Sequence, residues 1–278
     1  MEERVSNYEI TKHRVQKDFL KYDQKKMIEK FALKADEKYL YINFVGHLYR
    51  IDRQTGLLEW SEDGFVTCVE GDFNEALTIY DLLCDSKETC MASGDYVNLK
   101  SLSSLQSSSK NLGDGLFHGN DKIFDHKEKC LSEICEKLGG KKAGKGDVAY
   151  EIPWFDCVSC RIQFWNSDED FDAQMQIFMD KNILDFIRYE TVWYAVGHLM
   201  RRLTEEFKKA EQLGMLDTSF KNPSGLPEKD HYSTAYDMAL LGSYAVKNPV
   251  FRSICSSESY IAEIDNPTYE TTFYNHNK

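Results

Sequence analysis

The chain has 278 residues, of which 42% are hydrophobic and 13% aromatic, so it can bury a sizeable core and wholesale disorder is excluded. Acidic residues outnumber basic ones by 46 to 34, and a formal net charge of −12 makes nucleic-acid binding unexpected because such a chain repels phosphate backbones. The sequence predicts neither a signal peptide nor a membrane segment, since its start is charged and no apolar run reaches about 18 residues.

The first part of the chain alternates helical and extended patterns. Residues 11–35 place apolar side chains at helical spacing, which predicts a helix. Residues 39–51 are rich in aromatic and β-branched side chains and predict one strand. This strand should form a hairpin with the LLEW sequence that follows, turning near Thr55 and Gly56. Residues 72–83 predict a short helix.

The middle of the chain continues with mixed elements. Residues 101–115 are rich in serine and glycine and predict a loop, and residues 125–138 predict a helix. Strands of one sheet are expected over 158–165 and 174–179. The strongest periodicity lies in residues 188–209, where apolar side chains recur along one face of a long amphipathic helix.

Several sequence blocks between Tyr39 and Leu203 carry a resemblance. They are YINFVGHLYRIDRQTG, EALTIYDLLC, GDYVNLKSL, KKAGKGDVAYE, RIQFWNSDEDFDAQMQIFMD and IRYETVW. In these blocks the chain resembles a bacterial family known only as a domain of unknown function (number 3786). The resemblance implies a compact α+β domain and implies no chemistry.

The cysteines raise a metal or redox centre as one alternative. Cys157 and Cys160 have the C-x-x-C spacing of half a zinc site, and Cys130 and Cys135 could add ligands. In a strand, however, Cys157 and Cys160 point to opposite faces and cannot chelate one ion. We therefore predict buried or idle thiols and no metal or other cofactor. Eight cysteines without a dense framework favour reduced thiols and a cytoplasmic location.

Other polar residues also have structural explanations. Asp168, Asp170 and Asp172 have calcium-loop spacing, but the glycine and glutamate that such a loop requires are missing, so a solvated acidic turn is expected. His47 and His198 lie among apolar residues, and no acid or nucleophile can be nominated beside them. They are predicted to be packed or surface imidazoles.

From about residue 210 the sequence changes character. It contains LGMLDTSF, NPSGLP, HYSTAYDMA and AVKNPVFR. Over residues 210–278 it resembles serine-type D-alanyl-D-alanine carboxypeptidases, the low-molecular-weight penicillin-binding proteins that trim peptidoglycan. The residues themselves predict that Thr234 caps a helix, that Pro249 marks the end of this helix, and that residues 259–264 form a strand.

The carboxypeptidase resemblance implies chemistry for which the motifs are missing. The family uses a nucleophilic serine in S-x-x-K, an S-x-N and a K-T-G. The chain has no K-T-G, and residues 107–110 and 109–111 satisfy the other two motifs only by overlapping within one serine-rich loop. His231, Ser233 and Asp237 suggest a triad, but helix capping explains Asp237 without catalysis.

The sequence therefore predicts an α+β domain over residues 1–205, with a β-hairpin and a long amphipathic helix. A mainly helical carboxypeptidase-like segment over residues 206–278 follows it. The predicted function is a cytoplasmic, non-catalytic binding domain, of unknown partner, fused to a carboxypeptidase remnant. Two alternatives stay open: a serine-type D-alanyl-D-alanine carboxypeptidase acting on peptidoglycan, and a metal or redox protein that uses Cys157 and Cys160.

Overall fold

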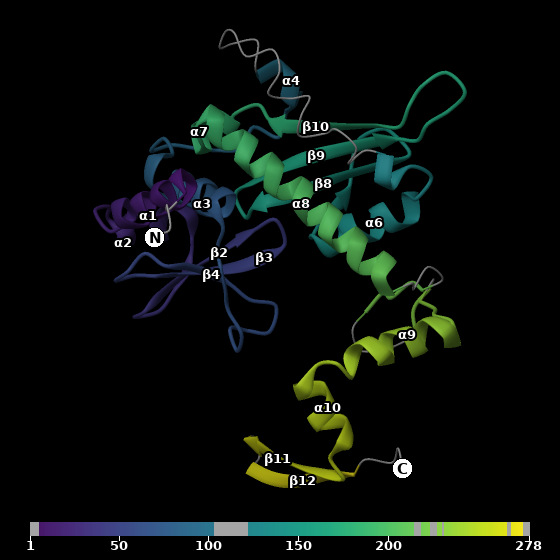
Figure 1. Ribbon diagram of the computed structural model, residues 1–278. Helices are drawn as coiled ribbons and strands as arrows, with labels where there is room; N and C mark the ends of the chain where they lie inside the picture. The colour runs from purple at the N-terminus through teal and green to yellow at the C-terminus, as the bar shows by residue number, and fades with distance from the viewer. Residues whose placement is uncertain are drawn as a thin grey trace, which may run out of the picture. The chain divides into compact units, whose positions relative to one another are not determined.

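The computed structural model of the protein describes residues 6–102, 122–213, 218–222, 227–229, 231–265 and 268–274. The chain divides into two compact units, Met1–Phe207 and Lys208–Lys278, which are described one at a time (Figure 1). Helices and antiparallel sheets are both present, so the predicted α+β class is confirmed.

The first sheet of the larger unit is an antiparallel meander in the order β1-β2-β3-β4-β5. Its strands are Lys34–Ala35, Tyr39–Phe44, His47–Asp52, Leu58–Trp60 and Val69–Glu70. The prediction of one strand over 39–51 is wrong, because the chain reverses at Val45 and Gly46, which both have positive φ. A two-residue turn of this kind matches the twist of the two strands that it joins. The sequence did not predict it, because its first residue is a valine that continues an apolar run. The second hairpin turn, ending at Gly56, lies where it was predicted.

The second sheet has the order β6-β10-β9-β8-β7. Its strands, in chain order, are Tyr96–Asn98, Lys141–Lys142, Val148–Phe155, Val158–Trp165 and Gln174–Asp180. The strands predicted over 158–165 and 174–179 are confirmed as β9 and β10, which pair directly. Burial alternates along β8 and β9, so one face of this sheet packs into the core.

Helices surround the two sheets (Figure 1). They are α1 Asn7–Phe19, α2 Gln24–Phe31, α3 Phe73–Asp85, α4 Leu99–Leu102, the short 3-10 helix Lys122–Phe124, α6 Glu128–Lys137, α7 Ile183–Phe186 and α8 Tyr189–Leu213. The single helix predicted over 11–35 is wrong: Asp23 accepts the amide hydrogens of Lys25 and Lys26 and starts a second helix. The predicted helices 72–83, 125–138 and 188–209 correspond to α3, α6 and α8. The loop predicted over 101–115 lies largely outside the described residues.

One apolar core joins both sheets of the larger unit. Phe44 on β2 stacks on Phe155 of β8, with 4.8 Å between ring centroids. The amide of Val45 donates to the carbonyl oxygen of Trp154 over 3.0 Å. His198 of α8 stacks on the Phe44 ring at 4.7 Å, so α8, β2 and β8 meet at one point of the core.

The smaller unit combines two helices with a hairpin. They are α9 Ala235–Ala245, α10 Pro249–Ser256, β11 Ser259–Asp265 and β12 Thr268–Tyr274. Thr234 caps α9 as predicted, its hydroxyl accepting the amide hydrogen of Asp237 over 3.0 Å. The predicted strand 259–264 is confirmed as β11, whereas β12 was not foreseen. Pro249 does more than mark the end of α9, because it is the first residue of α10, which Asn248 caps.

Candidate functional site

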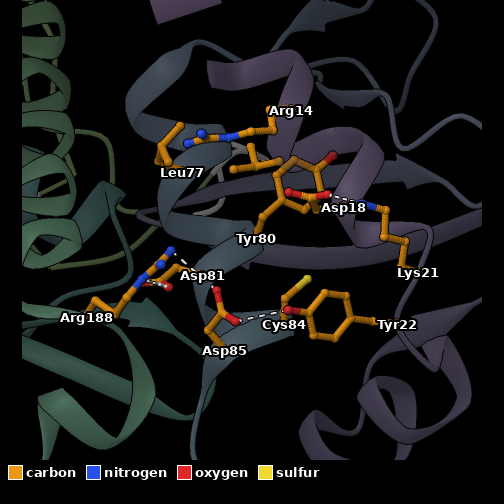
Figure 2. A pocket seen from close by; sticks show the side chains of 11 residues that line it. Arg14, Asp18, Lys21, Tyr22, Leu77, Tyr80, Asp81, Cys84, Asp85 and Arg188 are labelled. Carbon is orange, nitrogen blue, oxygen red and sulfur yellow. Dashed lines mark hydrogen bonds and ion pairs between the residues drawn. The ribbon is translucent and has the colours of Figure 1, made fainter. Parts of the chain in front are cut away.

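A pocket of about 530 Å³ opens between α1, α3 and the residue that precedes α8 (Figure 2). Such a volume lies within the range of small-molecule sites. Both apolar and charged side chains line it: Arg14, Val15, Asp18, Lys21, Tyr22, Leu77, Tyr80, Asp81, Cys84, Asp85 and Arg188.

The floor of the pocket is one face of α3. Leu77, Tyr80, Asp81 and Cys84 recur at helical spacing and therefore point to the same side. Leu77 and Tyr80 are buried. The Tyr80 hydroxyl donates a hydrogen bond to the carbonyl oxygen of Gly56, which fixes its ring in the floor.

Arg188 anchors one end of the pocket through two carboxylates of α3. Its Nε lies 2.6 Å from Oδ1 of Asp81, and its own amide donates to Oδ2 of Asp81 over 2.7 Å. The Asp81 carboxylate is buried, so these contacts replace the water that it has lost. Asp85 lies at the rim, 3.4 Å from the Arg188 guanidinium, and accepts a hydrogen bond from the Tyr22 hydroxyl over 3.1 Å.

Two of the groups that line the pocket, Cys84 and Tyr22, are held in their neutral forms. Burial raises the pKa of the Cys84 thiol to about 12, so it stays protonated and is a poor nucleophile. The hydrogen bond to Asp85 raises the pKa of Tyr22, which disfavours the phenolate. Neither group is poised to attack a substrate near neutral pH.

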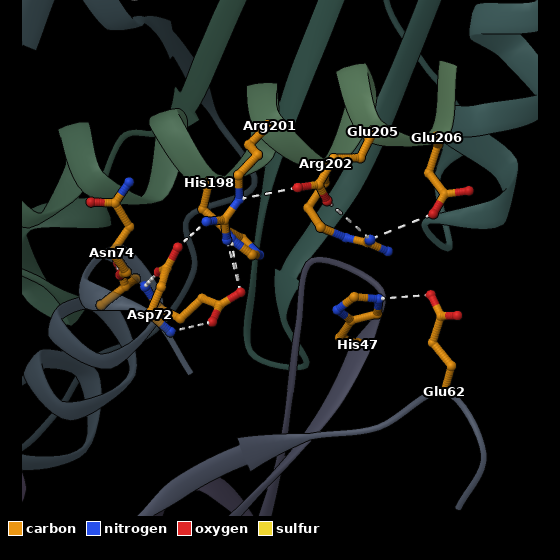
Figure 3. A network of polar contacts seen from close by, with 11 residues as sticks. His47, Glu62, Asp72, Asn74, His198, Arg201, Arg202, Glu205 and Glu206 are labelled. Carbon is orange, nitrogen blue, oxygen red and sulfur yellow. Dashed lines mark hydrogen bonds and ion pairs between the residues drawn. The ribbon is translucent and has the colours of Figure 1, made fainter. Parts of the chain in front are cut away.

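A second polar cluster lies where α8 meets the start of α3 (Figure 3). Asp72 and Glu75 form a capping box at the start of α3, and Arg201 of α8 bonds to both carboxylates. Nη2 of Arg201 lies 2.9 Å from Oε1 of Glu75 and 2.9 Å from Nδ1 of His198. Because a guanidinium can only donate, Nδ1 of His198 accepts, and the imidazole is neutral.

Burial shifts the two titratable groups of this cluster in opposite senses. Glu75 and His198 are both buried, with 3.4 Å between Oε1 and Nδ1. Burial raises the pKa of Glu75 to about 7, outweighing the hydrogen bonds that favour its charged form. Burial, together with the charges of Arg202 and His47, lowers the pKa of His198 to about 3. Between about pH 3 and pH 7 the fold therefore favours a protonated acid beside a neutral imidazole.

His47 and Arg202 extend the cluster toward β3 and α6. The His47 ring stacks on Trp60 at 4.1 Å, and its Nε2 lies 3.7 Å from a carboxylate oxygen of Glu62. Arg202 is buried and reaches Glu206 at 3.5 Å, while Glu206 also contacts Lys137 at 2.5 Å. Both histidines lie inside the structure, as expected of packed imidazoles.

Comparison with known sequences identifies the family to which the larger unit is similar. The profile described as "Domain of unknown function (DUF3786)" matches residues 23–202, well over half of the chain. The chain belongs to this family. The matched region contains the α3 side of the pocket and most of the polar cluster, whereas the α1 side of the pocket lies before residue 23 and Glu205 and Glu206 lie after residue 202. We refer to Met1–Phe207 as the DUF3786 unit. No solved structure matches the chain.

The C-terminal resemblance is confirmed as well. A D-alanyl-D-alanine carboxypeptidase profile matches residues 204–278. The D-alanyl-D-alanine carboxypeptidase DacF of Bacillus subtilis is 46% identical over 75 residues, which make up 25% of this chain and 19% of that protein. The chain thus spans about a fifth of the length of this curated relative.

The cysteines proposed as metal ligands lie in the DUF3786 unit. Cys160 and Cys135 are fully buried, and burial raises the pKa of both thiols. Cys157 is half-buried, and burial raises its pKa to about 12. These shifts favour the protonated thiols. Within the described residues, no group of three or more His, Cys, Asp or Glu side chains could hold a metal ion.

The acidic turn after β9 is held together by its own backbone. Oδ1 of Asp168 accepts the amide hydrogens of Asp170 and Phe171 over 2.9 and 2.8 Å. This pattern is an Asx turn, in which an aspartate stabilises the bend that follows it. The carboxylate of Asp168 is thereby engaged by the backbone of its own loop.

The carboxypeptidase-like unit brings together only part of the suggested triad. The Thr218 hydroxyl lies 2.8 Å from Oγ of Ser233 and donates to Oδ2 of buried Asp237 over 2.6 Å. Nδ1 of His231 instead accepts the amide hydrogen of Lys221 over 3.1 Å. Thr218, not a histidine, therefore links the serine to the aspartate. The overlapping motifs at 107–110 and 109–111 lie outside the described residues.

No helix in the described portion of the chain combines the length and the apolar character needed to cross a bilayer.

Proposed function

We propose that the DUF3786 domain is a non-catalytic, cytoplasmic binding domain that holds a small ligand in the pocket between α1 and α3. The observation that carries this proposal is the pocket itself: about 530 Å³, with an apolar floor and charged walls. Six of the eleven lining residues are charged, so the pocket suits a ligand that carries charged groups of its own.

The chemistry of the lining supports binding without turnover. Asp81 is fully engaged by Arg188, and the thiol of Cys84 is held protonated by burial. General acid–base catalysis needs a group whose pKa lies near the operating pH, and the pKa of Cys84 is displaced away from it. The cytoplasmic location rests on the cysteines, which are thiols and not disulfides.

A pocket-filling substitution tests the proposal. A fragment library is screened on the full chain for compounds that raise its melting temperature, as binding to the native state must do. Leu77→Trp fills the floor and should abolish the increase, whereas Leu48→Trp on the exposed side of β3 should retain it. Arg14→Trp at the exposed rim serves as a second blocking variant should Leu77→Trp fold poorly. Fragments that stabilise all four proteins equally contradict the proposal.

The carboxypeptidase-like unit supplies a second candidate function, because its relative in Bacillus subtilis is a D-alanyl-D-alanine carboxypeptidase. We propose that this unit is a catalytically inactive remnant. In support, Ser233 is bonded to Thr218 while His231 is bonded to the Lys221 amide. Incubation of the full chain with a fluorescent penicillin should give no covalent adduct. An adduct lost in Ser233→Ala, or in Ser107→Ala, would establish the enzyme instead.

A further inference from the structure

The pocket between α1 and α3 is electrically polarised along its length (Figure 2). Arg14 lies over Leu77 at one end, and Asp85 lies beside Tyr22 at the other. The pocket therefore presents a positive end and a negative end with an apolar floor between them.

Arg14 is the cation that the pocket leaves available. Lys21 pairs with Asp18 at 2.6 Å, and Arg188 pairs with Asp81 and Asp85. Within the described part of the chain, the guanidinium of Arg14 makes no hydrogen bond or ion pair. A guanidinium in this situation matches a carboxylate, which it can bind through two parallel hydrogen bonds.

The other end carries an excess of negative charge. Asp81 and Asp85 share the single guanidinium of Arg188, so this group of three has a net charge of −1. Asp81 is buried, whereas the Asp85 side chain is 38% exposed and faces the pocket at the rim. An ammonium group placed beside Asp85 would balance the charge there.

The separation of the two ends limits the length of the ligand. Leu77 and Asp85 are eight residues apart on α3, which corresponds to about 12 Å along the helix axis. An extended peptide advances about 3.5 Å per residue, so about three residues span this distance. A free amino acid is too short to reach both ends.

We infer that the pocket binds a short linear peptide of about three residues with both termini free. Its carboxylate pairs with Arg14, its ammonium group pairs with Asp85, and its central side chain packs on Leu77 and Tyr80. This inference rests on the proposed binding function and adds the class of ligand to it.

Blocked peptides and matched variants test this inference. Binding of Ala-Leu-Ala, its C-terminal amide, its N-acetyl derivative and free leucine to the full chain is measured by isothermal titration calorimetry. For the unsubstituted protein, either blocked peptide and free leucine should bind about tenfold or more weakly than Ala-Leu-Ala, since each loses a charged hydrogen bond.

The variants assign each terminus to its partner. In Arg14→Gln the free acid and the amide should bind equally, and in Asp85→Asn the free amine and the acetylated peptide should bind equally. Lys17→Gln removes the same charge from α1 at an exposed position outside the pocket and should preserve both preferences.

The possible failures are distinguishable. Equal binding of the free acid and the amide to the unsubstituted protein overturns the peptide inference, as does leucine binding as tightly as the tripeptide. If Ala-Leu-Ala fails while a library fragment still binds in a manner that Leu77→Trp abolishes, the peptide inference falls and the binding function stands. If nothing binds, both fall.

Discussion

The buried pair of Glu75 and His198 makes a prediction about how stability depends on pH. Burial raises the pKa of Glu75 from 4.5 to about 7, so the proton on this acid stabilises the fold below pH 4.5, and this contribution is lost as the pH rises toward 7. Burial lowers the pKa of His198 from 6.5 to about 3, so stability is lost as the pH falls from 6.5 toward 3. The two contributions have opposite slopes and overlap between pH 4.5 and 6.5.

Within that window the two slopes cancel. The unfolded chain carries one proton on His198, and the folded chain carries one proton on Glu75, so folding changes the proton count of the pair by zero. The cancellation holds even if the folded pair places its proton on the imidazole, because only the total number of protons enters the linkage relation. The pair thus contributes no pH dependence while both members are present.

Removing one member should expose the slope of the other. In Glu75→Gln, His198 binds its proton only in the unfolded state. As the pH is raised, the free energy of unfolding should therefore increase by up to about 1.4 kcal/mol per pH unit relative to the unsubstituted protein. In His198→Gln, Glu75 is protonated only in the folded state, so the free energy of unfolding should decrease by the same amount for each pH unit by which the pH is raised. Across the two-unit window each difference reaches about 2.7 kcal/mol.

Urea unfolding at several pH values measures these slopes. Tryptophan fluorescence is the suitable signal, because all four tryptophans lie in the DUF3786 unit, which is thereby followed separately from the smaller unit. Glu9→Gln and His13→Gln provide the control, since these side chains lie 4.0 Å apart on the exposed face of α1 and should leave the slope unchanged. If the Glu75 and His198 variants run parallel to the unsubstituted protein, burial does not separate the two pKa values.

Two further predictions concern stability alone. Gly56→Ala should lower the free energy of unfolding by about 2–5 kcal/mol, because φ is +71° and the new Cβ would clash with the backbone carbonyl of Gln16. Gly64→Ala is the control: its φ is also positive, at +69°, but a Cβ there meets open space, so the loss should be only about 1–2 kcal/mol. Comparable losses in urea unfolding would refute the clash. Asp81→Asn should lower the free energy of unfolding by about 1–3 kcal/mol, because it weakens the buried bonds to Arg188. Asp85→Asn at the exposed rim should lower it by less than about 1 kcal/mol. Thermal unfolding measures both losses. Equal costs would show that burial of Asp81 does not strengthen its pairing.

The elements that the sequence predicts well are those whose local signals agree. The long helix α8 and the strands β9 and β10 combine clear periodicity with suitable residue types. The turn at Val45 and Gly46 was missed because valine is rare where φ is positive, and only the packing of the neighbouring strands holds it there. The break at Asp23 was missed because a helix start can sit inside an otherwise unbroken helical pattern.

The contacts of the polar cluster join segments that are distant in the sequence, so periodicity could not predict them. Along α8, the spacing of His198, Arg201 and Arg202 shows only that they lie near one another on a helix. Glu75, the partner of His198 and Arg201, lies 126 residues before Arg201, and its role as a cap of α3 does not indicate a buried contact with α8. The capping box nevertheless explains why Glu75 meets Arg201 and His198 in the structure. It fixes the Glu75 carboxylate at the start of α3, so packing of α8 against this helix end brings Arg201 and His198 to a carboxylate that is already held in place.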